Sequence, residues 1–222
     1  VMTATPIPRT IAMTVFGDLD VSTLRELPGG RRPIETHVVG LAEHGPAWER
    51  RVWELAAEHV ANGRQVYVVA PKIGDDAAVP SFTSLRESLE TQEDEPEAAT
   101  VTWLAELVAA RPELRGACVR VLHGRQETQD KARTMAQFAE GDVDVLVSTT
   151  VVEVGVDVPN ATLMVVVDPE RFGISQLHQL RGRIGRGEHA STCLLVTRVA
   201  PDHPSRARLD AVAATTDGFE LA

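Results

Sequence analysis

Two arginines, Arg183 and Arg186, stand three residues apart in a segment whose chemistry suits phosphate binding. Guanidinium groups stay charged, and their forked N–H donors match phosphate oxygens. The neighbouring glycines, Gly182 and Gly185, predict a tight turn that leaves room for a ligand. Arginines placed in this way can stabilise the charge that develops in phosphoryl transfer, typically by roughly 10³–10⁵ in rate. The alternative for an isolated segment of this kind is a basic turn on a surface helix.

Two further segments precede the arginines in a fixed order. VMTATPIPRT opens the chain at 1–10, and STTVVEVGVDVPNAT at 148–162 follows an apolar stretch. Together with RFGISQLHQLRGRIGRG at 171–187, they resemble motifs III, V and VI of superfamily 2 helicases. Their sequences resemble those of the RecG family of ATP-dependent branched-DNA helicases. The same motifs also resemble those of the transcription-repair coupling translocase Mfd. TLRELP at 23–28 and TTDGFE at 215–220 favour RecG.

The resemblance implies a nucleotide site for which this chain supplies one half. In it, Arg183 and Arg186 contact the γ-phosphate and Gln179 helps to orient the site. The Gly-x-Asp of motif V falls on Gly155 and Asp157, where the glycine permits a close backbone approach and the aspartate reaches the ribose or the site water; Gly182 belongs to the same nucleotide-binding set. The structural alternatives are a surface salt bridge for the arginines, a solvated helix residue for Gln179 and a capping carboxylate for Asp157.

The resemblance also implies contacts to the DNA backbone, through hydroxyls, amides and cations that commonly bind phosphate. Motif III is expected to couple the nucleotide site to the DNA. Ordinary turn capping is the alternative for the hydroxyls, and a lone HGR turn is a weak pattern. The residues assigned to DNA are Lys72, His123, Gly124, Arg125, Ser148, Thr149 and Thr150, and those assigned to coupling are Thr3, Ala4 and Thr5.

The sequence lacks the phosphate-binding loop G-x-x-x-x-G-K-[ST] and a DExH acidic box. Its two lysines, Lys72 and Lys131, follow no glycine-rich loop. In the family both elements lie in a first RecA-like lobe, so ATP with Mg²⁺ would be held mainly by that lobe. We therefore expect this chain to be a C-terminal motor-lobe fragment that is inactive alone. The first lobe and an N-terminal wedge domain are expected partners within the parent protein, whose oligomeric state the sequence does not give and which we expect to be a monomer.

Composition sets further bounds. The net charge is −10 with acid concentrated at 87–97, which argues against a generally basic nucleic-acid surface but leaves room for a local patch. Cys118 and Cys193 lie in apolar stretches and are expected to be buried free thiols. No cluster of ligand residues has metal-binding spacing, and His178 is expected to pack or hydrogen-bond. The absence of a signal peptide or long apolar stretch favours a cytoplasmic protein.

Strands that alternate with helices predict an α/β domain with a central, mostly parallel sheet in three layers, as in RecA-like lobes. Residues 1–35 are interpreted as the end of the first lobe and a linker, 36–200 as the RecA-like lobe with an acidic, partly disordered insertion at 74–99, and 201–222 as a C-terminal helix leading onward. The strand ends after 69, 122, 148 and 167 should share one edge, where the DNA and nucleotide contacts are also expected. The expected strands are 35–39, 65–70, 117–122, 143–148, 162–167 and 191–197, and the expected helices are 46–62, 101–108, 128–140 and one from 204 that ends before 218.

We therefore predict the second motor lobe of a DNA helicase or translocase that remodels stalled replication forks and Holliday junctions in DNA repair and recombination. An Mfd-like translocase is one alternative, which a polymerase-binding domain in the parent would identify. A non-catalytic lobe that binds only DNA or a partner is another. The intact Arg183 and Arg186 argue against the non-catalytic alternative.

Overall fold

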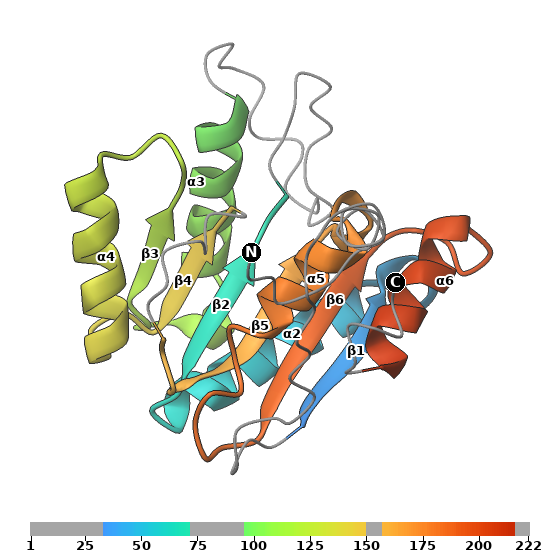
Figure 1. Cartoon of the computed structure of the whole chain (residues 1–222), viewed down its shortest axis with the longest axis horizontal. Helices are drawn as coiled ribbons and strands as arrows, with labels where there is room; N and C mark the ends of the chain where they lie inside the picture. Colours follow the sequence, from blue (N-terminus) through green and yellow to red (C-terminus); the bar gives the residue numbers. More distant parts are fainter. Residues whose placement is uncertain (1–32, 72–95, 150–156, 216–222) are drawn as a thin grey trace, which may run out of the picture.

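The computed structural model describes residues 33–71, 96–149 and 157–215, with side chains from residue 101 onward in the second range. Six strands in these ranges form one sheet in the order β1-β6-β5-β2-β4-β3, and every neighbouring pair is parallel. Figure 1 shows the twisted sheet from the face on which α5 packs. The predicted parallel α/β architecture is confirmed. The strands are β1 Ile34–Gly40, β2 Gln65–Val69, β3 Val119–Leu122, β4 Val145–Ser148, β5 Ala161–Val167 and β6 Ser191–Thr197.

The burial of each strand follows from its place in the sheet. Three of the four inner strands, β2, β4 and β5, are buried at every residue, as expected for mostly apolar strands covered on both faces. The outer strands β1 and β3 instead alternate between more and less exposed residues along most of their length. Apolar strands covered on both faces require a layer of helices on each side.

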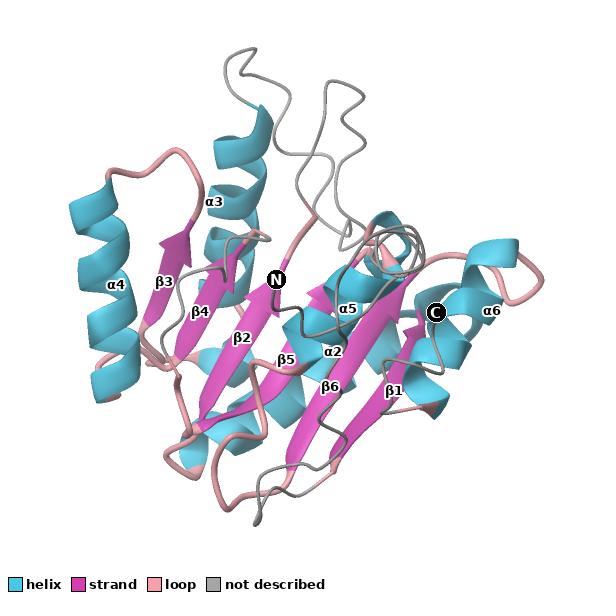
Figure 2. Cartoon of the chain, in the orientation of Figure 1, coloured by secondary structure: helices cyan, strands magenta, loops and turns pink. Residues whose placement is uncertain are grey.

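The helices form two layers around the sheet (Figure 2). One layer holds α2 (Leu41–Ala61) and α3 (Pro96–Ala109), and the short helix η1 (Pro112–Leu114) packs with them. The other holds α4 (Thr128–Glu140), α5 (Ile174–Arg181) and α6 (Pro204–Ala214), and η2 (Pro169–Arg171) follows β5. In the described residues no helix has the length and apolarity needed to cross a membrane.

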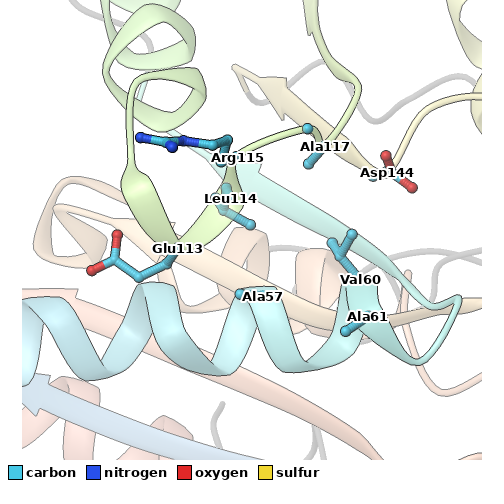
Figure 3. A pocket seen from close by; sticks show the side chains of 9 residues that line it. Ala57, Val60, Ala61, Glu113, Leu114, Arg115, Ala117 and Asp144 are labelled. Atoms are coloured by element: carbon cyan, nitrogen blue, oxygen red, sulfur yellow. The ribbon is translucent and has the colours of Figure 1, made fainter.

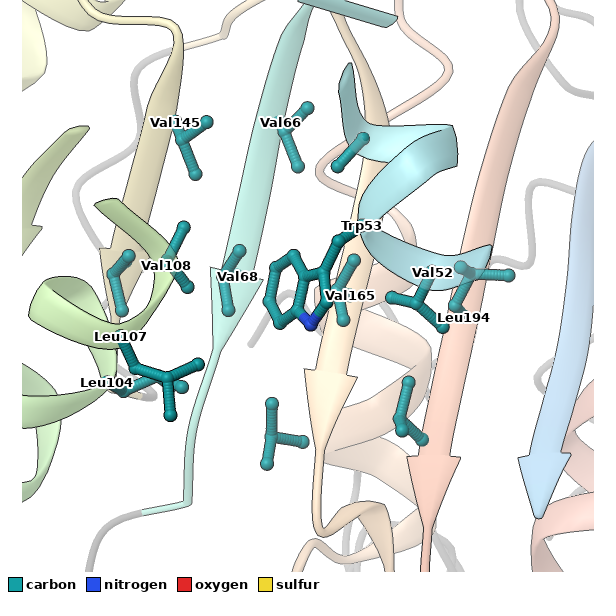
Figure 4. Close-up of a cluster of buried hydrophobic side chains, with 14 of the residues drawn as sticks. Val52, Trp53, Val66, Val68, Leu104, Leu107, Val108, Val145, Val165 and Leu194 are labelled. Atoms are coloured by element: carbon teal, nitrogen blue, oxygen red, sulfur yellow. The ribbon is translucent and has the colours of Figure 1, made fainter. Parts of the chain in front are cut away.

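A tryptophan anchors the first layer. Trp53 of α2 is fully buried, and Figure 4 shows its indole lying over the sheet between Val68 of β2 and Val165 of β5. Burying an aromatic side chain of this size removes on the order of 200 Å² from water, which makes it a large contributor to the hydrophobic core. The core therefore holds α2 and the central strands together.

Most element positions agree with the sequence prediction, and α4 and β6 have the predicted bounds. The helix predicted from residue 46 begins earlier, at Leu41, because the chain is helical on both sides of a break at Gly45, whose φ is 65°. The helix α3 begins at Pro96, inside the predicted acidic insertion; the rest of that insertion from 74 lies outside the described residues. No helix was predicted at α5. The linker predicted at 1–35 is described only from residue 33, where Ile34 already starts β1.

Candidate functional site

The arginine segment, which we define as residues 182–187, lies toward the amino ends of the strands. A Cβ atom added to Gly185 would be 2.7 Å from Cγ1 of Ile34, the first residue of β1. A Cβ on Gly187 would be 2.5 Å from the carbonyl oxygen of Pro159, just before β5. The expectation that these arginines lie at the carboxyl edge is therefore wrong, and their contact with a nucleotide stays a prediction. The reason is α5, which returns the chain from the carboxyl end of β5 to the amino end of β6 (Figure 1).

Of Gly182 and Gly185, only one has a backbone conformation that requires glycine. Gly185 has φ 70°, a left-handed conformation that side chains other than glycine rarely adopt. Gly182 caps α5 with φ −66°, which any residue adopts. The tight turn predicted for this segment is thus made at Gly185, where the chain also approaches Ile34 closely.

Arg186 joins the arginine segment to the end of motif V. Its Nη1 forms an ion pair with Oδ1 of Asp157, and its Nε donates to the carbonyl oxygen of Gly182 at 3.0 Å. The Arg186 side chain is 23% exposed and that of Asp157 is 57% exposed. Arg186 therefore has the salt bridge that was its structural alternative, while its predicted contact to phosphate stays a prediction. Among the described residues, Arg183 has no recorded side-chain hydrogen bond or ion pair.

Tyr67 of β2 is a polar residue under the arginine segment to which sequence reasoning gave no role. It is fully buried, in the same apolar cluster as Ile184 and Val158, the neighbours of Arg183 and Asp157 in the chain. Burial raises the pKa of Tyr67 to about 12, and the charges of Arg183 and Arg186 act against that rise. The sequence of β2 does not single out Tyr67, because an aromatic residue is ordinary in a strand.

Arg181 is a second residue that sequence reasoning missed. It is 3% exposed, and its guanidinium donates to the carbonyl oxygens of Val212 at 2.8 Å and Thr215 at 2.6 Å. It also lies 2.9 Å from Nδ1 of His178, so the hydrogen-bonding role expected for that histidine is confirmed. Arg181 therefore fixes the end of α6 to α5. Gln179 is exposed on the same helix, and its predicted role at the nucleotide stays a prediction.

The five described residues assigned to DNA follow β3 or lie at the end of β4, at the carboxyl edge of the sheet. The strand ends of β3 and β4 are tied by the Thr149 N–H, which donates to the carbonyl oxygen of Leu122 at 3.3 Å. Ser148 and Thr149 are fully buried, and neither hydroxyl has a hydrogen-bond partner within the described ranges. Their side chains do not face solvent in this conformation, and the proposed DNA contact stays a prediction.

A glutamine stabilises the HGR turn that follows β3 through two hydrogen bonds. The His123 N–H donates to Oε1 of Gln126 at 3.1 Å, and Nε2 of Gln126 donates to the carbonyl oxygen of Val121 at 3.2 Å. Gly124 and Arg125 are exposed, as a contact to a DNA phosphate requires. This turn is the part of the carboxyl edge whose exposure best fits the predicted role.

Several predicted site residues lie outside the described part of the chain. Motif III with Thr3, Ala4 and Thr5 precedes residue 33, and Lys72 follows the first described range. Thr150 and Gly155 fall between 149 and 157. The structure therefore locates motif VI, the end of motif V and the HGR turn.

A separate cavity of about 310 Å³ lies beside Ala117 and Asp144, which precede β3 and β4 (Figure 3). It is lined by the end of α2 at Ala57 and Val60, by Glu113 and Leu114 of η1, and by Asp144 before β4. The Asp144 carboxylate already accepts the Cys118 N–H at 2.7 Å. None of the residues assigned from the motifs lines this cavity.

Comparison with known proteins agrees with the motifs. A family model of the helicase conserved C-terminal domain matches residues 82–188. The chain is 54% identical over all 222 residues to the ATP-dependent DNA helicase RecG of Mycobacterium tuberculosis, and 43% identical over 221 residues to that of Synechocystis. The chain is thus similar to RecG helicases over its whole length. It spans 28% of the length of the mycobacterial RecG and 24% of the cyanobacterial one.

The RecG likeness extends to three dimensions. A solved structure of RecG bound to a three-way DNA junction superposes with a TM-score of 0.73 at 37% identity, covering 99% of this chain and 25% of that one. The yeast protein Dbp5, solved with RNA and ADP BeF3, superposes with a TM-score of 0.60 at 17% identity, covering 98% of this chain and 48% of that one. The Dbp5 match shows a shared fold, and the RecG match shows the same fold together with sequence similarity.

Proposed function

We propose that this chain is the second motor lobe of a RecG-type ATP-dependent DNA helicase that remodels branched DNA. The observation that carries the proposal is the 54% identity to a RecG helicase over the whole chain, with the arginine segment intact. In the proposal, the whole protein acts on stalled forks and Holliday junctions in the cytoplasm, and a wedge domain outside this chain recognises the branch. A RecG solved on a three-way DNA junction supports this choice of substrate.

ATP would bind between this lobe and a first RecA-like lobe. Arg183 and Arg186 would contact the γ-phosphate, and Gln179 would help to orient them. As the lobes close, Arg186 would exchange the Asp157 carboxylate, which now occupies part of its guanidinium, for a phosphate oxygen. The released Asp157 then becomes available for the ribose or for water. The Mg²⁺ that accompanies ATP is assigned to the first lobe, together with the loop that cradles the phosphates.

DNA would cross the carboxyl edge of the sheet, on the HGR turn. Arg125 and the exposed backbone at Gly124 suit a phosphate, and the Lys131 ammonium, which donates to the Gly124 carbonyl at 3.4 Å, adds a cation beside them. The HGR turn and the arginine segment lie at opposite ends of the strands of one lobe. Rotation of the lobe would therefore move the DNA contact and the nucleotide contact together. Backbone contacts of this kind give little sequence preference and a strong salt dependence.

The test is fork-stimulated ATP hydrolysis by the full-length protein that contains this chain, with Arg186→Ala compared to the wild type. We expect hydrolysis to fall by about two or more orders of magnitude, as for loss of an arginine finger, while ATP and DNA binding are largely kept. The matched control is Arg51→Ala, which removes another ion-paired arginine on the far layer of helices. Unchanged hydrolysis in Arg186→Ala would show that the Asp157 ion pair is the whole role of Arg186.

A further inference from the structure

Tyr67 occupies the centre of the sheet, beneath the arginine segment. It pairs with Leu146 of β4 on one side and Met164 of β5 on the other. Its ring is fully buried and meets the Phe138 ring of α4 edge to face, with 4.8 Å between the ring centroids. Packing on both sides therefore fixes the direction in which the phenol points.

The Tyr67 hydroxyl has no role in this packing. It is buried and has no hydrogen-bond partner among the described residues. Leaving a buried hydroxyl unpaired costs about 1–3 kcal/mol, a cost that phenylalanine in the same space would avoid. An unpaired buried polar group in a native protein calls for an explanation beyond stability.

The surroundings of the phenol supply that explanation. Val158 and Ile184 belong to the same buried cluster as Tyr67, and the charges of Arg183 and Arg186 act on the phenol, so the arginine segment lies near it. Ile184 directly follows Arg183, and no recorded side-chain hydrogen bond or ion pair in the described ranges involves that arginine. The phenol is protonated at neutral pH, and its oxygen can accept a hydrogen bond from a guanidinium.

We propose that Tyr67 is a positioning residue for the arginine segment, and that its hydroxyl accepts a hydrogen bond from Arg183 when the two motor lobes close on ATP. One N–H of the five on the guanidinium is used in this way, and the others remain for the phosphate. The phenol, held by Phe138, would then fix the direction of an arginine that its own segment leaves without a partner. This inference rests on the proposed function.

The experiment is a double-mutant cycle in the full-length protein, using Tyr67→Phe and Arg183→Ala separately and together. We expect Tyr67→Phe to lower kcat for fork-stimulated ATP hydrolysis about tenfold, the effect of one lost hydrogen bond in the transition state, with KM for ATP changed less than about twofold. In the Arg183→Ala background, Tyr67→Phe should change kcat less than about twofold, because residues that act as a unit are not additive.

Stability provides the second readout, measured on this chain by urea unfolding at neutral pH. Tyr67→Phe should leave the midpoint unchanged or raise it, since the hydroxyl has no partner to lose. The matched control is Thr36→Val, which removes another buried hydroxyl without a partner, from the outer strand β1. It should leave both the midpoint and kcat at wild-type values.

The outcomes separate the inference from the proposed function. If Arg183→Ala and Arg186→Ala both leave hydrolysis unchanged, the proposed function fails and the inference falls with it. If they lower hydrolysis while Tyr67→Phe does not, only the inference is overturned. The same holds if the effects of Tyr67→Phe and Arg183→Ala multiply, or if Tyr67→Phe lowers the urea midpoint, which would make the hydroxyl a structural group.

Discussion

Arg186 and Asp157 form an ion pair that connects two segments 29 residues apart in the sequence. The pair joins the end of motif V to motif VI without a ligand, and it occupies the guanidinium proposed to bind phosphate. Arg186 is the more enclosed partner, at 23% exposure, and Asp157 is 57% exposed. The carboxylate therefore competes with a nucleotide phosphate for the donors of this guanidinium.

Substitution of Asp157 by asparagine should help ATP to bind. Removing the carboxylate frees Arg186 from an exposed ion pair worth about 0.2–1 kcal/mol, so KM for ATP should fall up to about fivefold while stability changes by less than about 1 kcal/mol. Steady-state ATP hydrolysis and urea unfolding measure the two effects. The control is Asp210→Asn, because Asp210 is also 57% exposed and ion-paired, to Arg206. A rise in KM would instead favour a direct contact from Asp157 to the ribose.

A series of glycine-to-alanine variants should separate backbone strain from crowding in the arginine segment. Gly182→Ala should be close to neutral, because φ is −66° and the nearest atom to the new Cβ is 3.4 Å away. Gly141→Ala, outside the segment, measures backbone strain alone, because φ is 90° and the space around it is open. It should lose about 1–2 kcal/mol of unfolding free energy. Gly185→Ala should lose more unfolding free energy, because it combines the strain of a φ of 70° with a clash against Ile34. Urea unfolding measures all three, and equal losses for Gly141→Ala and Gly185→Ala would show that β1 moves aside freely.

Loss of Arg181 should weaken the attachment of α6. Arg181→Ala leaves the Val212 and Thr215 carbonyls without these donors and empties a buried site, so we expect a loss of about 2–4 kcal/mol of unfolding free energy. Arg181→Lys should recover only part of it, because one ammonium cannot reproduce the planar fork. Amide hydrogen exchange should speed up first near Val212. Arg51→Ala, at an exposed arginine paired with Glu58, should cost less than about 1 kcal/mol by the same measurements.

The fold was largely predictable because hydrophobic periodicity reports it directly. The continuous apolar sequence of β5 predicts a buried strand, and the spacing of Met135 and Phe138 predicts the helix α4. Both patterns can be recognised from a few neighbouring residues. The helix α5 was missed because it has only 8 residues and contains three apolar ones, too short a pattern to distinguish from a loop. Its omission also explains the wrong placement of the arginine segment, since an unseen helix hides the return of the chain to the amino edge.

The site was predictable only as far as residue identity reveals it. Motif order pointed to Arg186 and Asp157, but their pairing across 29 residues depends on the tertiary fold. Tyr67 and Arg181 carried no local signal, because a tyrosine in a strand and an arginine in a helix are ordinary at either buried or exposed positions. Their roles come from burial and from the partners that they have or lack.

Alkaline pH should destabilise the chain in two steps, through Cys193 and then Tyr67. Burial raises the pKa of the Cys193 thiol from 9.0 to about 12 and that of the Tyr67 phenol from 10.0 to about 12. Both groups are neutral in the folded chain where the unfolded chain already releases a proton, so unfolding becomes more favourable as pH rises through this window. The stability present below pH 9 should fall by on the order of 4 kcal/mol through Cys193 and 3 kcal/mol through Tyr67 by pH 12.

Two variants assign the steps. Urea unfolding between pH 7 and 11 should show the decline beginning near pH 9 in the wild type, where only Cys193 of the pair contributes. Cys193→Ala should delay the onset to near pH 10, and Tyr67→Phe should keep the onset but flatten the slope above pH 10. Because Tyr67 is the single tyrosine of the chain, absorbance at tyrosinate wavelengths reports its ionisation alone. A phenol that ionises near its ordinary pKa of 10 in the folded chain would show that water reaches it, and would remove the enclosed setting on which its contact with Arg183 depends.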